Sequence, residues 1–448
     1  MTPENPWHGL PARGQTRRAF ALVIVLVAVA AVTLVLITLQ STALRHAYAG
    51  REAVALTRAE WAARAGLESA IARLAYNIEN ADAGSSFTTY EDMADLSQGT
   101  VEGAAWEVLY DDEQYEREGP ADAHAKMNVN RMSHDDLLEL QYMTEDVADA
   151  IIDWIDEDDT PSEFGAEEGS YASVNPPYEP RNGPVRSIRE LELVRGVQPD
   201  LLRGEDWNLN GRLDPNEDDG DLSWPADNSN GVLDAGWSEH ITASSVDFGL
   251  AFSGEERLDL SIASADELTS RMSFLSTAQA QAVLEHARNP QATIWDYIIT
   301  PLTTIARQSD AIPDNISDLS FDEIEELIDE VTLNPASAGP VPGRLNLNTC
   351  QRDTLDLLAA IDATTADILL LERNARGGAG FTTMFDLLDI PGVTPTTVAV
   401  LSPFIDVRPN SYVVTSRGRD EGTGIEVELT ATIERSALPV PVTSLIIR

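Results

Sequence analysis

A long uncharged apolar run near the N-terminus constrains this chain more than any other feature. It extends from Ala19 to Leu39, and Arg17 and Arg18 stand directly before it. An α-helix rises about 1.5 Å per residue, so a run of this length matches a hydrocarbon core of roughly 30 Å. Arginines ahead of an apolar segment favour a cytoplasmic N-terminus. We therefore predict a transmembrane helix over residues 20–39, with the bulk of the chain on the far side of the membrane.

A cleaved signal peptide is the alternative interpretation of this run. The apolar part of such a peptide usually has about 7–15 residues and ends close to its cleavage site. The candidate site here, the sequence AYA before Gly50, lies well beyond the apolar end and follows Arg45. This distance favours an anchor that is kept over a peptide that is discarded.

The helical pattern continues far past the apolar run. No proline occurs over residues 12–119, and Leu67, Ile71 and Leu74 share one helical face. We therefore predict a single helix over residues 20–80. Its first half is apolar and suits lipid, and its second half is amphipathic and suits packing on protein.

The N-terminal region resembles that of the type IV pilins and pseudopilins. It has a basic leader, then a phenylalanine and one long helix whose first half is apolar. The stretches RRAFALVIVL and AEWAARAGLESAIARL are most similar to minor pseudopilin K, the general secretion pathway protein K family of type II secretion systems. The resemblance implies that a prepilin peptidase cuts between Ala19 and Phe20, removes the leader 1–19 and leaves the apolar segment. Most pilins have glycine in place of Ala19 and glutamate in place of Ile24, and the K branch typically lacks that glutamate.

Alternating apolar and polar residues predict strands near both ends of the chain. Residues 101–110 alternate after the long helix, and residues 425–433 alternate near the C-terminus. We predict an α+β fold in which the N-terminal helix packs on a pseudopilin-type antiparallel sheet. Residues 81–120 and 409–448 build this sheet, and a large, mainly helical insertion separates them.

The insertion contains an internal repeat. The sequence KMNVNRMSHDDLLELQ aligns with RLNLNTCQRDTLDLLA, and the two copies occupy residues 121–200 and 339–408. Each copy has an Asn-apolar-Asn motif, two predicted helices and a later glycine, Gly196 or Gly392. This pattern is typical of helix-hairpin-helix or sterile-alpha-motif (SAM)-like domains. The sequence of residues 244–338 predicts further helices, and we assign no catalytic or binding role to it.

One form of the helix-hairpin-helix domain binds DNA, so a membrane-anchored protein of DNA uptake is the alternative function. In that form, amides at tight glycine turns and nearby basic residues hold phosphates. Here Gln198 and Thr394 stand where a second glycine is common. The chain also has 30 Lys and Arg against 75 Asp and Glu, a net charge of −45. Such a surface repels phosphates, so we expect no nucleic-acid partner.

The region 201–243 carries the most explicit chemistry. The sequence DWNLNGRLDPNE matches a twelve-residue calcium loop, in which oxygen ligands surround a sharp turn at the sixth place, here Gly211. Hard oxygen donors in this pattern favour Ca²⁺ over Zn²⁺. We therefore predict a structural calcium ion held by Asp206, Asn208, Asn210, the backbone carbonyl of Arg212, Asp214 and Glu217.

Two further acidic stretches are candidate cation sites. The shorter loop DNSNGVLD contributes Asp227 and Asp234 as predicted calcium ligands, but it lacks a distal glutamate because Trp237 stands at that place. The segment 153–184, which includes Asp153, Asp156, Glu167 and Glu168, is interpreted as a structured loop that is able to hold another cation. No histidine or nucleophile beside these carboxylates indicates catalysis.

These features predict a minor pseudopilin rather than an enzyme. The resemblance implies a single-pass protein of the bacterial inner membrane, with its bulk in the periplasm at the tip of the pseudopilus. There it would support the export of folded proteins. Its expected partners are other minor pseudopilins, the major pseudopilin and the prepilin peptidase.

Overall fold

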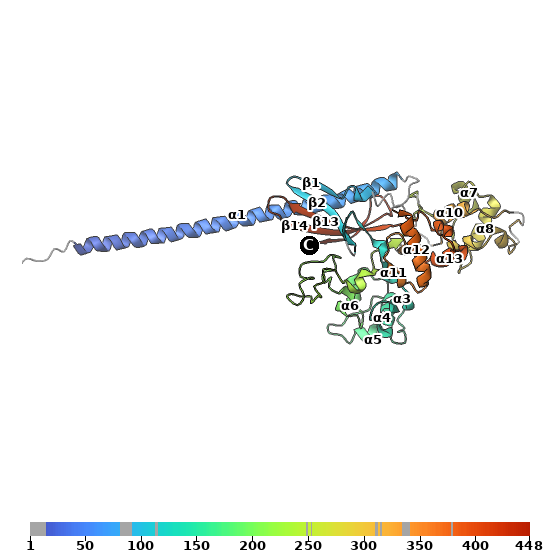
Figure 1. Cartoon of the computed structure of the whole chain (residues 1–448), viewed down its shortest axis with the longest axis horizontal. Coiled ribbons are helices and arrows are strands. Elements are labelled where there is room, and N and C mark those ends of the chain that lie inside the picture. The colour runs from blue at the N-terminus through green and yellow to red at the C-terminus, as the bar shows by residue number, and fades with distance from the viewer. Residues whose placement is uncertain are drawn as a thin grey trace, which may run out of the picture.

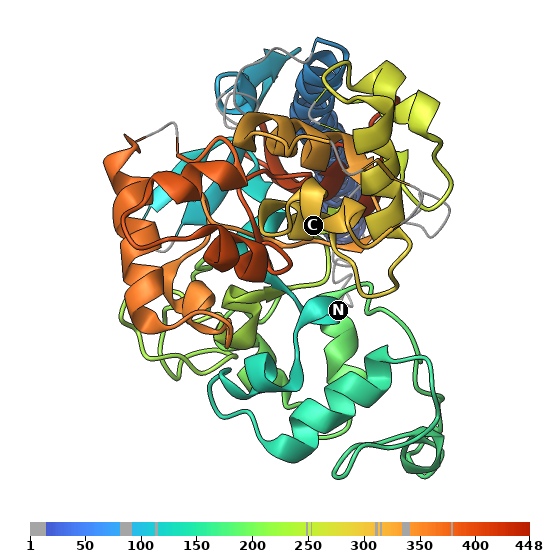
Figure 2. The same cartoon turned by 90° about the vertical axis from the view of Figure 1, so that its right-hand side faces the viewer.

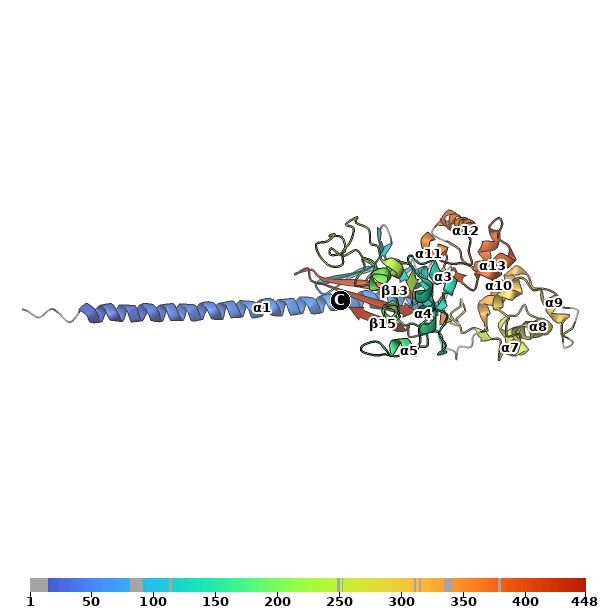
Figure 3. The same cartoon turned by 90° about the horizontal axis from the view of Figure 1, so that it is seen from below.

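The structure, a computed structural model, describes residues 15–80, 92–112, 115–247, 250–251, 253–309, 312–313, 316–333, 341–377 and 380–448. Helix α1 (Gln15–Glu79) projects from a globular body as a long rod (Figure 1 and Figure 3). Every residue from Phe20 to Val54 is exposed. Within the described ranges, only α1 is long and apolar enough to cross a membrane.

The predicted single N-terminal helix is confirmed, with an earlier start. It begins at Gln15 rather than near Phe20, because the residues between them include neither glycine nor proline. The predicted cleavage position between Ala19 and Phe20 therefore lies within a helix. The first 14 residues of the predicted leader lie outside the described residues.

The sheet joins strands from both ends of the chain, and the predicted α+β fold is confirmed. Its main path runs in the order β1, β2, β13, β14, β15, and all four neighbouring pairs are antiparallel. Two short strands pair with β2 and β13 respectively. The bounds are β1 (Gln98–Val101), β2 (Ala104–Asp112), β3 (Tyr115–Glu118), β4 (Ala121–Asp122), β13 (Ser411–Asp420), β14 (Glu426–Glu434) and β15 (Val442–Ile447).

The alternating stretch 101–110 is predicted as one strand, but it contains the turn of a β-hairpin between β1 and β2. Val101 closes β1 and pairs with Ala104, which opens β2. The two residues between them, Glu102 and Gly103, have φ angles of 28° and 83°. Positive φ at both central residues matches the twist of a two-residue hairpin, and glycine adopts it easily.

The second half of α1 lies on the sheet through small side chains. A Cβ on Gly418 of β13 would overlap backbone atoms of Ala59 and Ala63, so only glycine fits at this crossing. Leu67 and Leu74 fill a core with the buried face of β14. The buried stripe of the helix consists of Ala55, Ala59, Ala62, Ala63, Gly66, Leu67, Ala70, Leu74 and Ile78.

The insertion lies between β4 and β13. Its helices α7 to α13 lie at the end of the body away from the exposed half of α1, while its green region, residues 201–243, lies back beside the sheet (Figure 1). Its first part contains the 3₁₀-helices η1 (Ala123–Ala125), η2 (Val129–Arg131), η3 (Ile188–Leu193) and η4 (Gly236–Glu239), the helices α3 (His134–Leu138), α4 (Glu145–Ile155), α5 (Glu168–Tyr171) and α6 (Pro199–Arg203), and the strands β5 (Met127–Asn128), β6 (Ile241–Thr242) and β7 (Val246–Asp247).

The middle of the insertion contains β8 (Leu258–Asp259), α7 (Ala265–Arg271), α8 (Thr277–Ala287), η5 (Ile294–Ile298), α9 (Leu302–Ala306), α10 (Phe321–Glu330) and β9 (Val331–Thr332). Its last part contains β10 (Val341–Pro342), β11 (Leu345–Asn346), α11 (Arg352–Asp356), α12 (Ala363–Ala375), η8 (Met384–Asp389), α13 (Pro395–Leu401) and β12 (Ile405–Asp406). Figure 2 shows the first part (teal and green), the middle (yellow) and the last part (orange) around the end of the sheet. One hydrophobic core runs through all three, from Met127 to Val407.

The two repeats have the same order of elements. Each contains a short strand, two helices, a 3₁₀-helix and a third helix in this order: β5, α3, α4, η3 and α6 in the first, and β11, α11, α12, η8 and α13 in the second. The first repeat has two additional elements, η2 after β5 and α5 after α4. The short strands β5 and β11 each form a parallel pair, with β6 and β12 respectively. The internal repeat read from the sequence thus corresponds to a repeated order of elements, and its SAM-like assignment stays a prediction.

The Asn-apolar-Asn motif has the same structural role in both repeats. The amide of Asn130 donates to the carbonyl of Val185 (2.9 Å) and accepts from the N–H of the same residue (2.6 Å). Asn348 makes the same pair of bonds with Phe381, at 2.8 and 2.8 Å. Each asparagine therefore fixes the chain ahead of the second half of its repeat, because it satisfies both backbone groups of one residue.

Candidate functional site

The predicted calcium loop, residues 206–217, winds tightly around Asp206. This side chain is 2% exposed, and its two oxygens accept the N–H groups of Asn210 (2.9 Å) and Gly211 (2.8 Å). Gly211 has a φ of 70°, a conformation that favours glycine. The structure thus places the first residue of the loop against the turn at its fifth and sixth places.

Glu217 folds back over the start of the loop. Its carboxylate is 1% exposed and accepts the N–H groups of Trp207 (3.1 Å) and Asp214 (3.0 Å). The last predicted ligand therefore lies inside the loop. Burial raises the pKa of Glu217, and the negative charge of Asp206 raises it further.

The remaining predicted ligands meet at Asp214. The amide nitrogens of Asn208 and Asn210 both donate to its carboxylate, at 2.7 and 2.9 Å. The amide oxygen of Asn208 is buried and has no hydrogen-bond partner among the described residues. Arg212 donates its N–H to Asn210 (2.8 Å), while its guanidinium lies 3.9 Å from Glu428 of β14.

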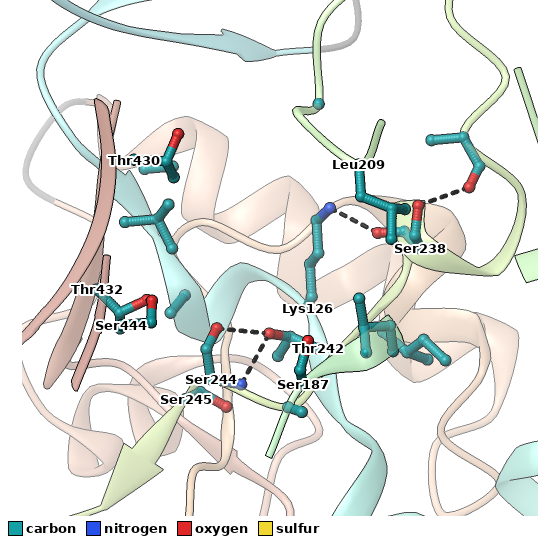
Figure 4. Close-up of a pocket in the computed structure, with 18 of the residues that line it drawn as sticks. Lys126, Ser187, Leu209, Ser238, Thr242, Ser244, Ser245, Thr430, Thr432 and Ser444 are labelled. Carbon is teal, nitrogen blue, oxygen red and sulfur yellow. Dashed lines mark hydrogen bonds between the residues drawn. The ribbon is translucent and has the colours of Figure 1, made fainter. Parts of the chain in front are cut away.

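The loop interior has an excess of negative charge. Burial raises the pKa of both Asp206 and Glu217. The only lysine of the chain, Lys126, lies nearby and is half-buried, and desolvation lowers its pKa. Its ammonium donates to the carbonyl of Ser238 at 2.7 Å (Figure 4). Two buried carboxylates and an unpaired amide oxygen fit a hard cation, which would supply the missing positive charge.

Carboxylates alone do not complete a metal site in this loop. Across the described part of the chain, no three Asp, Glu, His or Cys side chains come together closely enough to hold an ion. The side-chain oxygens of Asn208 and Asn210 and the carbonyl of Arg212 would therefore have to join the carboxylates. Calcium accepts such mixed sets of six to eight oxygens.

The second loop is bonded to a glutamate from outside it, which the spacing of the loop itself does not predict. Glu205 accepts the N–H groups of Asn228 (3.1 Å) and Asp234 (3.2 Å), much as Glu217 does in the first loop. The carboxylate of Asp227 instead accepts the N–H of Gly220 at 2.9 Å. The backbone of Asp234 is thus bonded to the carboxylate of Glu205, whereas the carboxylate of Asp227 is bonded to the turn at Gly220. The loop pattern expects a glutamate at the place of Trp237. The glutamate that bonds to this loop is instead Glu205, which precedes both loops in the sequence.

The first loop is attached to the sheet by an ion-pair network. Glu428 of β14 lies 3.4 Å from Arg417 and 3.3 Å from Arg448, in addition to its contact with Arg212. Arg448 also donates to the carbonyls of Asn208 (3.1 Å) and Leu209 (3.3 Å). Arg448 therefore joins the loop to β14.

A cleft of about 1910 Å³ separates this loop from the sheet face opposite α1. Alternate residues of β14 define the two faces, because Leu429 faces the helix core while Thr430 and Thr432 line the cleft. Figure 4 shows Lys126 and Leu209 on the opposite side of the cleft from Thr430 and Thr432. The cleft is lined by polar and apolar groups together, with Leu213, Val232 and Ile446 among the apolar ones.

Comparison with known proteins assigns part of this chain to a family. A family model described as "Type II secretion system (T2SS), protein K" matches residues 116–204. The resemblance to protein K is confirmed. The protein K match begins in β3, contains the first repeat and ends two residues before Asp206. Protein K is a component of a secretion system and not an enzyme family. A protein K region behind an apolar helix of spanning length fits a protein anchored in the inner membrane.

Individual relatives match this chain over limited lengths or at low identity. The type II secretion system protein K of Pectobacterium carotovorum subsp. carotovorum is 42% identical over 59 residues, which are 13% of this chain and 18% of that protein. The chain thus matches less than a fifth of the length of this curated relative. A solved GspK-GspI-GspJ complex from enterotoxigenic Escherichia coli aligns with 14% identity and a TM-score of 0.45, over 89% of this chain and 99% of that one.

Proposed function

We propose that this protein is a minor pseudopilin that caps the tip of a periplasmic pseudopilus in a type II secretion machine. The observation that carries the proposal is the protein K match at residues 116–204, which begins in β3 and continues into the insertion of a module made of a long helix and an antiparallel sheet. Its partners are other minor pseudopilins and the major pseudopilin. Together they support the export of folded proteins.

The shape of the molecule supports a position at the tip. The exposed half of α1 points one way, and the insertion extends from the opposite end of the sheet (Figure 1). A further subunit stacked above would meet the insertion. Ile24, in place of the glutamate of most pilins, is consistent with a subunit that has no neighbour above it.

We also propose that the loop 206–217 binds a structural Ca²⁺ ion. Asp206, Asn208, Asn210, Asp214 and Glu217 would hold it together with the carbonyl of Arg212, and Asp227 and Asp234 remain proposed ligands of a second ion. The ion supplies positive charge to a loop whose carboxylates are buried. The chain itself fixes the loop on the sheet through Glu428 and Arg448.

Association with the other minor pseudopilins of the same organism is the direct test of this function. We expect the full chain, purified in detergent, to co-elute with those subunits and to leave duplex DNA unbound at physiological salt. A surface with net charge −45 makes few phosphate contacts. Tight, strongly salt-dependent retention of DNA without association with the pseudopilins would contradict the proposal and favour the DNA-uptake alternative.

Processing provides a second test. We expect N-terminal sequencing of the mature protein to begin at Phe20, because the prepilin peptidase removes residues 1–19. Ala19→Glu should block the cut and leave a membrane-held precursor on an immunoblot, because a bulky charge replaces a small residue at the cleavage position. A mature protein that begins at Gly50 would instead indicate an ordinary signal peptide.

A further inference from the structure

Strand β15 forms one edge of the main sheet, and its whole length is exposed. It pairs with β14, and no strand among the described residues pairs with its other side. Natural edge strands are commonly short or interrupted by charges or proline, which prevents unwanted pairing. At the opposite end of the strand order, β1 has four residues including a glycine, whereas β15 has the sequence VTSLII without any charge. The edge at β15 is thus open to a further strand.

The hydrogen-bond register leaves alternate backbone groups of β15 facing outward. Glu428 and Arg448 exchange both of their N–H···O bonds at the end of the β14–β15 pair, at 3.2 and 2.9 Å. In an antiparallel pair, such residues alternate with residues whose N–H and C=O groups face away from the partner strand. Counted back from Arg448, Ile447 and Leu445 are of the second kind. Their backbone groups therefore face the open edge.

The side chains at this edge border an apolar groove beside α1. Leu445 is opposite Ala431, which belongs to the core under α1, so both lie on the helix side of the sheet. Leu445 is 50% exposed and, with Val442, lines a groove of about 520 Å³ whose other wall is α1. Trp61 lies on that wall, 62% exposed, with the guanidinium of Arg64 5.6 Å from its ring centre. Tryptophan and arginine are the side chains that often dominate protein interfaces.

We propose that the edge of β15 and this groove receive a strand of a neighbouring minor pseudopilin, which extends the sheet. This inference rests on the proposed secretion role. The added strand bonds through its main chain to Leu445 and Ile447, and its apolar side chains enter the groove beside Trp61. Strand addition draws affinity from main-chain hydrogen bonds and specificity from pockets for alternate side chains.

The position of β15 favours a neighbouring subunit as the occupant. Figure 3 shows β15 at the end of the body where α1 enters, away from α8 and α9. A protein joined there lies beside α1, as a subunit anchored in the same membrane would. A second copy of this chain would bring another net charge of −45 to the edge, which disfavours self-association. An antiparallel pair of β15 strands would also point the two α1 helices in opposite directions, although both have to enter one membrane.

Proline at an outward amide tests the strand addition. Ile447→Pro removes an N–H that makes no bond to β14, and edge strands accept proline at such positions. The full chain in detergent is titrated with the other minor pseudopilins of the same organism. We expect Ile447→Pro to weaken association about tenfold or more, because the partner's acceptor loses its donor and meets the proline ring. In the wild type, association should slow amide hydrogen exchange in residues 442–448.

Thr100→Pro is the matched control in β1. Val101 and Ala104 flank the two-residue turn as a bonded pair, so the N–H of Thr100, one residue earlier, also faces away from β2. Thr100→Pro should associate like the wild type, and both proline variants should melt at the wild-type temperature. Trp61→Ala leaves the backbone of β15 unchanged and should also weaken association about tenfold.

The possible results separate this inference from the secretion role. Equal association of the wild type, Ile447→Pro and Trp61→Ala, or an equal loss in Thr100→Pro, would overturn strand addition at β15 and leave the secretion role intact. Self-association of the wild type that Ile447→Pro abolishes would identify a second copy as the occupant and overturn the proposed neighbour. If the wild type associates with none of the minor pseudopilins, both the inference and the secretion role are contradicted.

Discussion

Gly418→Ala is expected to lower the free energy of unfolding of the helix–sheet module by about 3 kcal/mol. The new Cβ would overlap the carbonyl oxygen of Ala59 and the amide nitrogen of Ala63. Both are backbone atoms in the middle of α1, so no side-chain rotation relieves the overlap. The helix has to move away from β13, and the neighbouring buried alanines then lose contact with the sheet. Chemical denaturation of the full chain in detergent, followed by tryptophan fluorescence, measures the loss.

Gly50→Ala is the matched control for this prediction. Gly50 lies in the same helix, and no atom lies within 4 Å of a Cβ built there. Replacing an exposed helical glycine by alanine should stabilise the helix by up to about 1 kcal/mol. The same change in side chain thus has opposite expected effects at the two glycines. Similar small effects of both variants would mean that α1 does not approach the sheet as closely as the structure indicates.

The parts of the fold that were predicted from the sequence depend on local patterns. The apolar run and the absence of proline determine α1, and the alternation at residues 425–433 determines β14, whose Leu429 and Ile433 are buried. The hairpin at Glu102 and Gly103 was missed, because two adjoining strands continue the same alternation. The single core of the insertion was not predictable either, since it depends on contacts between residues as distant as Met127 and Val407.

The candidate sites also include some residues that local spacing predicts and others that only the fold reveals. The spacing within residues 206–217 predicts Asp206 and Glu217 as ligands, since loop ligands follow one another along the chain, and the structure shows both side chains buried. Glu205 was not found, because it reaches the second loop from upstream of the first. The Asn-apolar-Asn motifs were recognised as a repeat, but only the fold shows that Asn130 and Asn348 bind backbone groups far along the chain.

Removal of calcium is expected to destabilise the full chain by about 2.7 kcal/mol when free calcium had been a hundred times the dissociation constant. An ion that binds only the folded loop stabilises it in proportion to the logarithm of that ratio. We therefore expect a higher melting temperature in millimolar Ca²⁺ than in chelator, with Mg²⁺ a poor substitute because it demands a smaller, more rigid set of ligands. Asp206→Ala or Glu217→Ala should abolish most of the gain. Asp135→Ala, at an exposed position of α3, should leave it unchanged.

The pH dependence of this gain follows from the carboxylates of the loop. Burial raises the pKa of Asp206 and Glu217 in the folded, calcium-free chain above their values of about 4 in the unfolded chain. Protonation therefore favours the folded state at low pH, and this stabilisation is lost as the pH rises through the folded pKa values. A calcium ion replaces those protons, so the difference in melting temperature between calcium and chelator should grow from pH 4 toward pH 7. If this difference is absent at every pH, and the two alanine variants melt alike in both buffers, residues 206–217 form an acidic turn that binds no calcium.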